Sequence, residues 1–138
     1  MYLQIAEEMI NASVEKAEEL GISVVISVVD SGGHLVVLKR MDGAIFGSID
    51  ISKDKAFTSA ATKTTTEELG KMSQSGQSLF GLNTTNQCRY VIFGGGIPLF
   101  QDNILAGSIG VSGGTVEQDV AIAQAGIDKY NRMIIKSR

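Results

Sequence analysis

The chain has 138 residues, of which 43% are hydrophobic and 20% charged, and its formal net charge at pH 7 is −3. This length and composition predict one globular domain over residues 1–138 and exclude a disordered chain. The 15 acidic residues outnumber the 12 basic ones, so the charge gives no basis for nucleic acid as a partner.

A second exclusion concerns membranes and secretion. No stretch approaches the ~18 consecutive apolar residues of a membrane-spanning helix, so no membrane partner is expected. The N-terminal segment carries Glu7, Glu8 and Glu15 and lacks the basic and apolar regions of a secretory signal. The single cysteine, Cys88, cannot form a disulfide within the chain, which suits a reducing compartment. We therefore expect a cytoplasmic protein.

The first predicted elements are a helix and a hairpin. Apolar residues recur at spacings of three and four over residues 2–20, which predicts an amphipathic helix that Gly21 can end. Residues 22–29 (ISVVISVV) are rich in β-branched side chains, as in a buried strand. A four-residue turn of Asp, Ser and two Gly then leads to a second strand over 34–40, which predicts an antiparallel hairpin.

The middle of the chain predicts a helix, a loop and a strand. Residues 48–70 have helical spacing of Ala and other apolar residues, with Gly70 as the stop. Residues 71–87 are polar and rich in turn formers, so we expect a loop with one short helical turn, a common place for binding groups. A strand is expected over 89–93, ending at three consecutive glycines.

The end of the chain predicts a last strand over 104–111 and a last helix over 115–136. Thr115 followed by Gln118 is a capping box, which marks the start of that helix. The order of elements predicts an α/β fold with a largely antiparallel sheet. We expect the first and last helices on one side of this sheet and the middle helix on the other.

Two glycine-rich turns raise the question of phosphate binding. Gly94-Gly95-Gly96 is not followed by the Lys and Ser/Thr of a P-loop. Gly113 and Gly114 precede a helix without the G-x-G-x-x-G spacing of a dinucleotide-binding fold. Tight turns and close packing are the favoured interpretation of these glycines. A carboxylate or propionate bound by backbone N–H groups of residues 110–115 stays open as an alternative.

His34 is the only histidine and follows two glycines. Its imidazole should therefore be reachable, as a ligand of iron or cobalt or as a hydrogen-bonding group for a substrate. The residues alone favour the alternative, a solvent-facing strand residue. One Cys and one His do not make a zinc site, and no base–nucleophile pair is apparent.

Four stretches carry a family resemblance: VVDSGGHLVVLKRMDGA, KAFTSA, FGGGIPLF and LAGSIGVSGGTVEQDVAIAQAGI. In order and spacing they resemble proteins related to the glycolate-operon accessory protein and to the haem-binding protein HbpS. The C-terminal domain of the propanediol-utilisation corrinoid adenosyltransferase belongs to the same group. The resemblance implies an α-β-α sandwich with a central five-stranded antiparallel sheet, broadly profilin-like. It also implies a homo-oligomer, often an octamer, and haem binding in some members.

The resemblance implies a site as well. The positions of this chain that match the family's motifs are the hairpin with His34, the segment with Arg40, and Lys55. With no second histidine in the chain, His34 would bind haem iron with Cys88, Met41 or a neighbouring subunit's His34 opposite. Arg40 and Lys55 are then the candidate partners of the haem propionates. Tyr90 is the further candidate ligand beside Cys88 if His34 is not one.

Three functions remain open from the sequence. The preferred hypothesis is a non-enzymatic protein that binds haem or another tetrapyrrole, or handles a cofactor, in the metabolism of a small diol, glycerol or hydroxy acid. The second is an enzyme acting on a small carboxylate or aldehyde, with His34 as general acid/base and Arg40 as anion clamp. The third is a structural or protein-interaction module. Apolar residues in loops, such as Phe46, Leu79 and Phe80, predict a homo-oligomer larger than a dimer.

Overall fold

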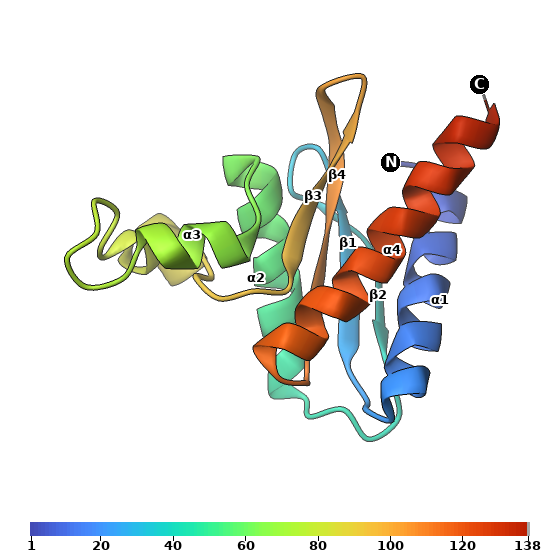
Figure 1. Ribbon diagram of the computed structural model, residues 1–138, viewed down its shortest axis with the longest axis horizontal. Helices are drawn as coiled ribbons and strands as arrows, with labels where there is room; N and C mark the ends of the chain where they lie inside the picture. Colours follow the sequence, from blue (N-terminus) through green and yellow to red (C-terminus); the bar gives the residue numbers. More distant parts are fainter. Residues whose placement is uncertain (138) are drawn as a thin grey trace.

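A computed structural model describes residues 1–137, with helices on both faces of one antiparallel sheet (Figure 1). The sheet has four strands in the order β2-β1-β4-β3. In chain order the elements are α1 (Leu3–Leu20), β1 (Val25–Asp30), β2 (Leu35–Arg40), α2 (Gly47–Thr62), α3 (Thr66–Met72), the 3-10 turns η1 (Leu82–Thr84) and η2 (Asn86–Cys88), β3 (Gly96–Gln101), β4 (Ile104–Ser112) and α4 (Val116–Ser137).

The predicted hairpin is confirmed. β1 and β2 are antiparallel, with Val25 opposite Arg40 at one end and Val29 opposite Leu35 at the other. On its other side β1 pairs antiparallel with β4, and β4 pairs with β3. β1 is buried along most of its length because helices cover both of its faces. Its sequence is β-branched from Val25 to Val29 apart from Ser27, as expected for a strand whose two faces are both covered.

The alternating side chains of β1 face two different helix layers. Ile26 and Val28 belong to the main core, which α1 and α4 complete on one face of the sheet. Val29 points to the opposite face and packs with Ala56 and Ala60 of α2. The predicted division of the helices between the two faces is therefore confirmed. None of the helices among residues 1–137 has the length and hydropathy needed to cross a bilayer.

The predicted strand over residues 89–93 is wrong, and the sheet accordingly has four strands instead of five. This segment is tied to α2 and not to the sheet: the N–H of Val91 donates to Oγ1 of Thr58 at 3.0 Å. The strand forms further on, from Gly96 to Gln101, and includes Pro98. A proline without an N–H is tolerated there because β3 is an edge strand.

The predicted helix over residues 48–70 is interrupted. α2 ends at Thr62, where Lys63 takes a left-handed conformation with φ of 56°, and α3 begins three residues later. Thr65 caps α3, since its hydroxyl accepts a hydrogen bond from the N–H of Glu68 at 3.1 Å. The local run of threonines thus offers the backbone a capping alternative to a continuous helix.

Other local signals in the sequence are confirmed. Gly21 ends α1 in the left-handed conformation with φ of 71°. The capping box at the start of α4 is complete: the N–H of Gln118 donates to Oγ1 of Thr115, and the N–H of Thr115 donates to Oε1 of Gln118. Leu3 is one of the apolar residues of the predicted amphipathic helix but is exposed, and the buried residues of α1 begin at Ala6.

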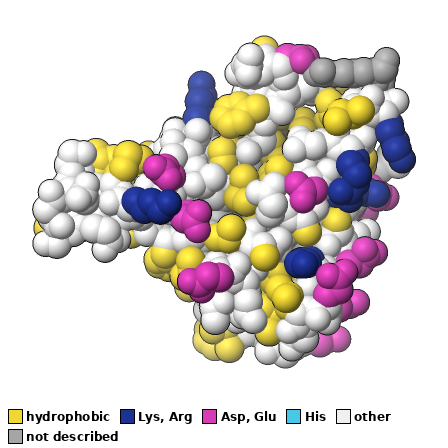
Figure 2. All heavy atoms as spheres, viewed as in Figure 1, with side chains coloured by type: hydrophobic (Ala, Val, Ile, Leu, Met, Phe, Trp, Pro, Cys, Tyr) yellow, Lys and Arg dark blue, Asp and Glu magenta, His cyan; other side chains and the backbone are white. Residues whose placement is uncertain are grey.

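Residues 73–93 form an arm that projects away from the sheet together with α3 (Figure 1). The loop predicted over 71–87 is confirmed from residue 73 onward, but it contains two short helical turns, η1 and η2, where one was predicted. Figure 2 shows that the outer arm is mostly uncharged on the visible face, whereas charged side chains gather over α1 and α4. Leu79 and Phe80 are exposed on the arm, which leaves apolar surface on a projecting segment.

Candidate functional site

His34 lies immediately before β2, on a turn organised by Asp30. Oδ1 of Asp30 accepts hydrogen bonds from the N–H groups of Gly32 at 2.9 Å and of His34 at 3.0 Å. Desolvation raises the pKa of Asp30, but these N–H donors and the neighbouring imidazole outweigh it and hold that pKa below its ordinary value. The Asp30 side chain is thus a carboxylate that fixes the turn.

The imidazole of His34 is presented to solvent. Its side chain is 83% exposed, and Nδ1 lies 3.3 Å from Oδ1 of Asp30. A carboxylate beside one ring nitrogen is the arrangement that orients a metal-binding histidine and directs its other nitrogen to the metal. The structure therefore leaves Nε2 as the nitrogen available to a ligand.

The His34 turn packs against an aromatic and cationic cluster, of which only Tyr90 was a candidate from the sequence. Gly33 has φ of 82°, and a Cβ there would lie 3.0 Å from Cδ2 of Phe57 on α2. The guanidinium carbon of Arg89 lies 3.6 Å from the centroid of the Phe57 ring. The rings of Phe57 and Tyr90 are 6.1 Å apart and inclined by 30°. We call Phe57, Arg89 and Tyr90 the aromatic shelf.

Cys88 lies beyond the aromatic shelf, in a cavity of about 370 Å³ at the base of the arm. It is exposed, and its φ of 61° follows two further left-handed residues, Asn86 and Gln87. Cys88 shares the cavity lining with Tyr90, Asp54 and Phe93. The lining of this cavity includes no residue of the His34 turn.

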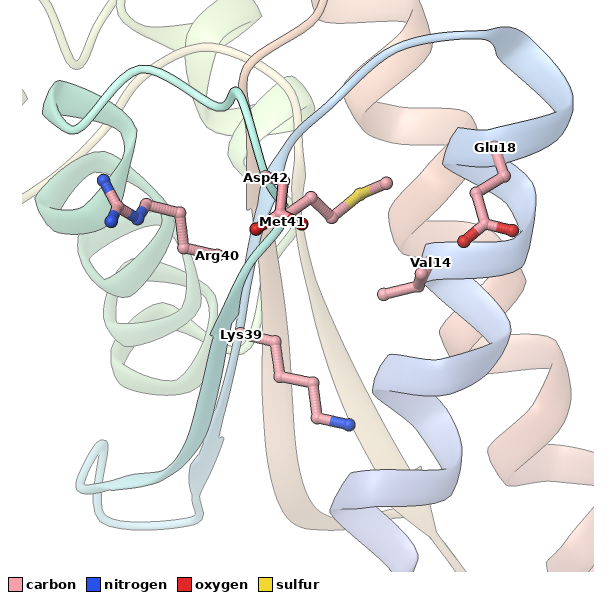
Figure 3. Close-up of a pocket in the computed structure, with 6 residues that line it drawn as sticks. All are labelled: Val14, Glu18, Lys39, Arg40, Met41 and Asp42. Carbon is pink, nitrogen blue, oxygen red and sulfur yellow. The ribbon is translucent and has the colours of Figure 1, made fainter.

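Arg40 lies far from His34. The two residues flank opposite ends of β2, about 20 Å apart at the usual strand rise of ~3.3 Å per residue. Arg40 lines a separate cavity of about 440 Å³ between β2 and α1. In Figure 3 Lys39 and Met41 point toward α1 and Arg40 points to the other side of the strand. Within one chain, Arg40 and His34 cannot contact the same small ligand.

Lys55 is buried in an ion pair. Its side chain is 1% exposed, and Nζ donates to Oδ2 of Asp119 at 3.0 Å and to the carbonyl oxygen of Val111 at 2.8 Å. The ring of Phe93 covers the ammonium at 5.1 Å. Burial lowers the pKa of Lys55 and raises that of Asp119. With these partners, Lys55 cannot meet a propionate at the surface.

The glycine turn before α4 is also satisfied internally. The N–H of Gly114 donates to Oδ1 of Asp119 at 2.9 Å, and the N–H of Thr115 donates to Gln118. Side chains of the protein itself thus take the place of the carboxylate or propionate that the sequence left open for residues 110–115. Gly95 packs against the same ion pair, since a Cβ there would lie 2.6 Å from Nζ of Lys55.

Residues 1–128 match the protein-family model described as haem degrading protein HbpS-like. The chain belongs to the HbpS-like family. The resemblance that its four motifs carry is thereby confirmed. This HbpS-like chain has a mixed α/β fold with an antiparallel sheet of four strands.

Individual relatives agree with this assignment. The chain is 44% identical over 131 residues to a 15.0 kDa protein in the dhaT-dhaS intergenic region of Citrobacter freundii, which covers 95% of this chain and 92% of that one. It is also 44% identical over 124 residues to the corrinoid adenosyltransferase PduO of Salmonella typhimurium, covering 90% of this chain. This HbpS-like chain spans only 37% of the length of PduO.

A solved structure is similar in three dimensions. A crystal structure of a PduOC:haem complex superposes with a TM-score of 0.90 at 41% identity and covers 94% of each chain.

Proposed function

We propose that this protein is a non-enzymatic haem-binding accessory protein in which His34 is the primary iron ligand. The observation that carries the proposal is the exposed imidazole with Nδ1 held beside Asp30. Such an imidazole is a ready strong-field donor for haem iron. The haem complex of the similar PduOC supports the choice of cofactor.

The site would be completed by a second copy of the chain. His34 stands on the surface, so one chain would hold haem iron through His34 and leave part of the haem uncovered. Cys88 lines the cavity at the base of the arm and Met41 lines the cavity between β2 and α1, and neither lining includes His34. The His34 of a second subunit would supply another ligand to the iron and cover the rest of the haem. This arrangement makes a homo-oligomer, such as an octamer, part of the proposal.

The proposed role is that of a single-domain cytoplasmic accessory protein in the metabolism of a small diol, glycerol or hydroxy acid, as the family resemblance implies. The exposed and unpaired Cys88 fits a reducing compartment. An enzyme that uses His34 as acid/base would need a second reacting group beside it. Among residues 1–137, the polar side chain that partners His34 is that of Asp30.

The test is a haem titration of the wild type and His34→Ala, followed by the Soret band. We expect a saturable Soret shift in the wild type and its loss in His34→Ala, because the variant lacks the iron donor. Asn131→Ala is the control, since Asn131 is an exposed polar residue on α4, on the other face of the sheet. Its titration should match that of the wild type.

Two results would contradict the proposal. An unchanged spectrum and affinity in His34→Ala would remove His34 as ligand and point to Cys88 or Tyr90. The absence of a Soret shift in the wild type would remove haem from the function of this protein.

A separate measurement distinguishes haem binding from haem degradation. A Soret band that persists under oxygen with a reductant supports a binding role, and bleaching of the band would favour an enzymatic one.

A further inference from the structure

We infer that the aromatic shelf is the second half of the His34 site and binds a carboxylate of a planar ligand through Arg89. This inference rests on the proposed function, because it assigns Arg89, and neither Arg40 nor Lys55, as the partner of a haem propionate. The ligand class is a flat macrocycle that carries carboxylates at its edge.

Proximity is the first argument. Gly33 precedes His34, and a Cβ on Gly33 would lie within 3.0–3.4 Å of two Phe57 ring atoms. The His34 turn therefore lies against the Phe57 ring of the aromatic shelf. The Arg89 guanidinium stacks on the same ring at 3.6 Å. Arg89 is thus connected to the His34 turn through one shared ring, that of Phe57. The His34 turn, two aromatic rings and one guanidinium are thus joined by a series of contacts.

The hydrogen-bonding capacity of Arg89 is the second argument. Nε lies 3.3 Å from Oδ1 of Asp54, and the Arg89 side chain remains 42% exposed. A guanidinium has five N–H donors in a planar fork. The pair with Asp54 engages the Nε edge and holds the plane against Phe57, while the terminal nitrogens have no partner among the described residues. A fork held in this way is ready for a second carboxylate.

The aromatic rings are the third argument. Phe57 and Tyr90 are both half-buried, so each exposes part of its ring beside the guanidinium. Aromatic surface next to a cation suits a conjugated ring that ends in a carboxylate, because stacking and the charge-assisted bond act on one ligand at once. The cavity beyond Tyr90 leaves room at the outer edge of the aromatic shelf.

The experiment compares two arginines and three porphyrins. Arg89→Gln, Arg89→Lys and the control Arg40→Gln are titrated with haem, with haem dimethyl ester and with metal-free protoporphyrin IX. The ester keeps the iron and lacks free carboxylates, whereas the metal-free porphyrin keeps the carboxylates and cannot ligate His34. Circular dichroism of each variant verifies that the fold is retained.

We expect Arg89→Gln to bind haem about tenfold more weakly, as for loss of one charge-assisted hydrogen bond. Its affinity for the ester should equal that of the wild type, and its Soret position should not change. Arg89→Lys should recover part of the haem affinity, and Arg40→Gln should match the wild type with all three porphyrins. Metal-free protoporphyrin should bind weakly to the wild type and more weakly still to Arg89→Gln.

Failure of this inference is distinguishable from failure of the proposed function. Equal haem affinity of Arg89→Gln and wild type, or an equal loss in Arg40→Gln, would overturn the Arg89 assignment while His34 ligation stands. A haem affinity that depends on Arg89 but not on His34 would support the aromatic shelf and overturn His34 as ligand. A wild type that binds none of the three porphyrins would overturn both.

Discussion

Lys53 and Lys55 stand two residues apart on α2 and have opposite environments. Lys53 is 39% exposed, with Nζ 3.6 Å from Oδ1 of Asp50, so water screens its charge. Lys55 is enclosed between α2, β4 and α4, where Asp119 and a backbone carbonyl are its partners. The same residue type therefore serves a solvated surface in one case and a buried link between distant segments in the other.

Removal of the buried amine should be costly. We expect Lys55→Met to lower the free energy of unfolding by about 3–5 kcal/mol, because Asp119 is left buried without its cation. Urea denaturation measures this change. Lys53→Met is the matched control, with an expected loss below ~1 kcal/mol. Adding Asp119→Asn to Lys55→Met should recover part of the loss, since the amide removes the charge and can still accept from Gly114. Equal losses in the two single lysine variants would contradict this account.

Among the elements, α2 and β4 make an unusually close contact. A Cβ on Gly110 of β4 would overlap the carbonyl oxygen of Ser52 and lie 2.6 Å from the backbone nitrogen of Ala56. Ser52 and Ala56 are themselves buried and small. The helix backbone thus rests almost directly on the strand, which explains why α2 carries Ala and Ser where most core helices carry Leu or Ile.

This close contact predicts that alanine substitution has a much larger effect on stability at Gly110 than at Gly47. Gly110→Ala should lower the free energy of unfolding by about 1–3 kcal/mol, because backbone atoms block the new methyl group and cannot rotate away. Gly47→Ala at the start of α2 should be neutral or stabilising by up to ~1 kcal/mol, since nothing lies within 4 Å of the added Cβ. Thermal or urea unfolding of both variants tests this, and a neutral Gly110→Ala would show that α2 can shift.

At the scale of the whole molecule, two of the exposed aromatic side chains lie on the arm and on the segment before α2. Phe80 on the arm is 70% exposed and Phe46 before α2 is 80% exposed. The arm stands out from the sheet, and its outer part has little contact with the body (Figure 1). When another surface covers these aromatic side chains, the free energy of the system falls because their apolar area is removed from water.

We therefore expect the wild type to form a homo-oligomer larger than a dimer. Phe80→Ser combined with Phe46→Ser should lower the mass measured by light scattering at micromolar concentration and leave the far-ultraviolet circular dichroism unchanged. Tyr2→Ser is the control, since Tyr2 is exposed near the N-terminus. Phe93→Ser would not serve, because the Phe93 ring covers the ammonium of Lys55. A monomeric wild type, or an unchanged mass in the double variant, would remove these segments as the contact.

The sequence by itself determined the local elements. Several features depend only on residues within a few positions of each other. They are the apolar spacing of the helices, the Gly21 stop, the capping box of Thr115 and Gln118, and the glycine turn before His34. Such short-range patterns act through the backbone before any tertiary contact exists. The antiparallel pairing of β1 and β2 belongs to this group, because a four-residue turn brings the two strands side by side.

Only the tertiary structure decided which side chains share a site. Lys55 meets Asp119 across 64 positions, and Arg89 meets Asp54 across 35. No local pattern distinguishes Lys55 from Lys53, or Arg89 from Arg40, because charge and side-chain type are the same in each pair. The strand expected at 89–93 was wrong for the same reason: its apolar sequence fits a strand, but hydrogen bonds to α2 hold it away from the sheet. Long-range packing fixes burial and partners, and these determine whether a charge stabilises the fold or is free to meet a ligand.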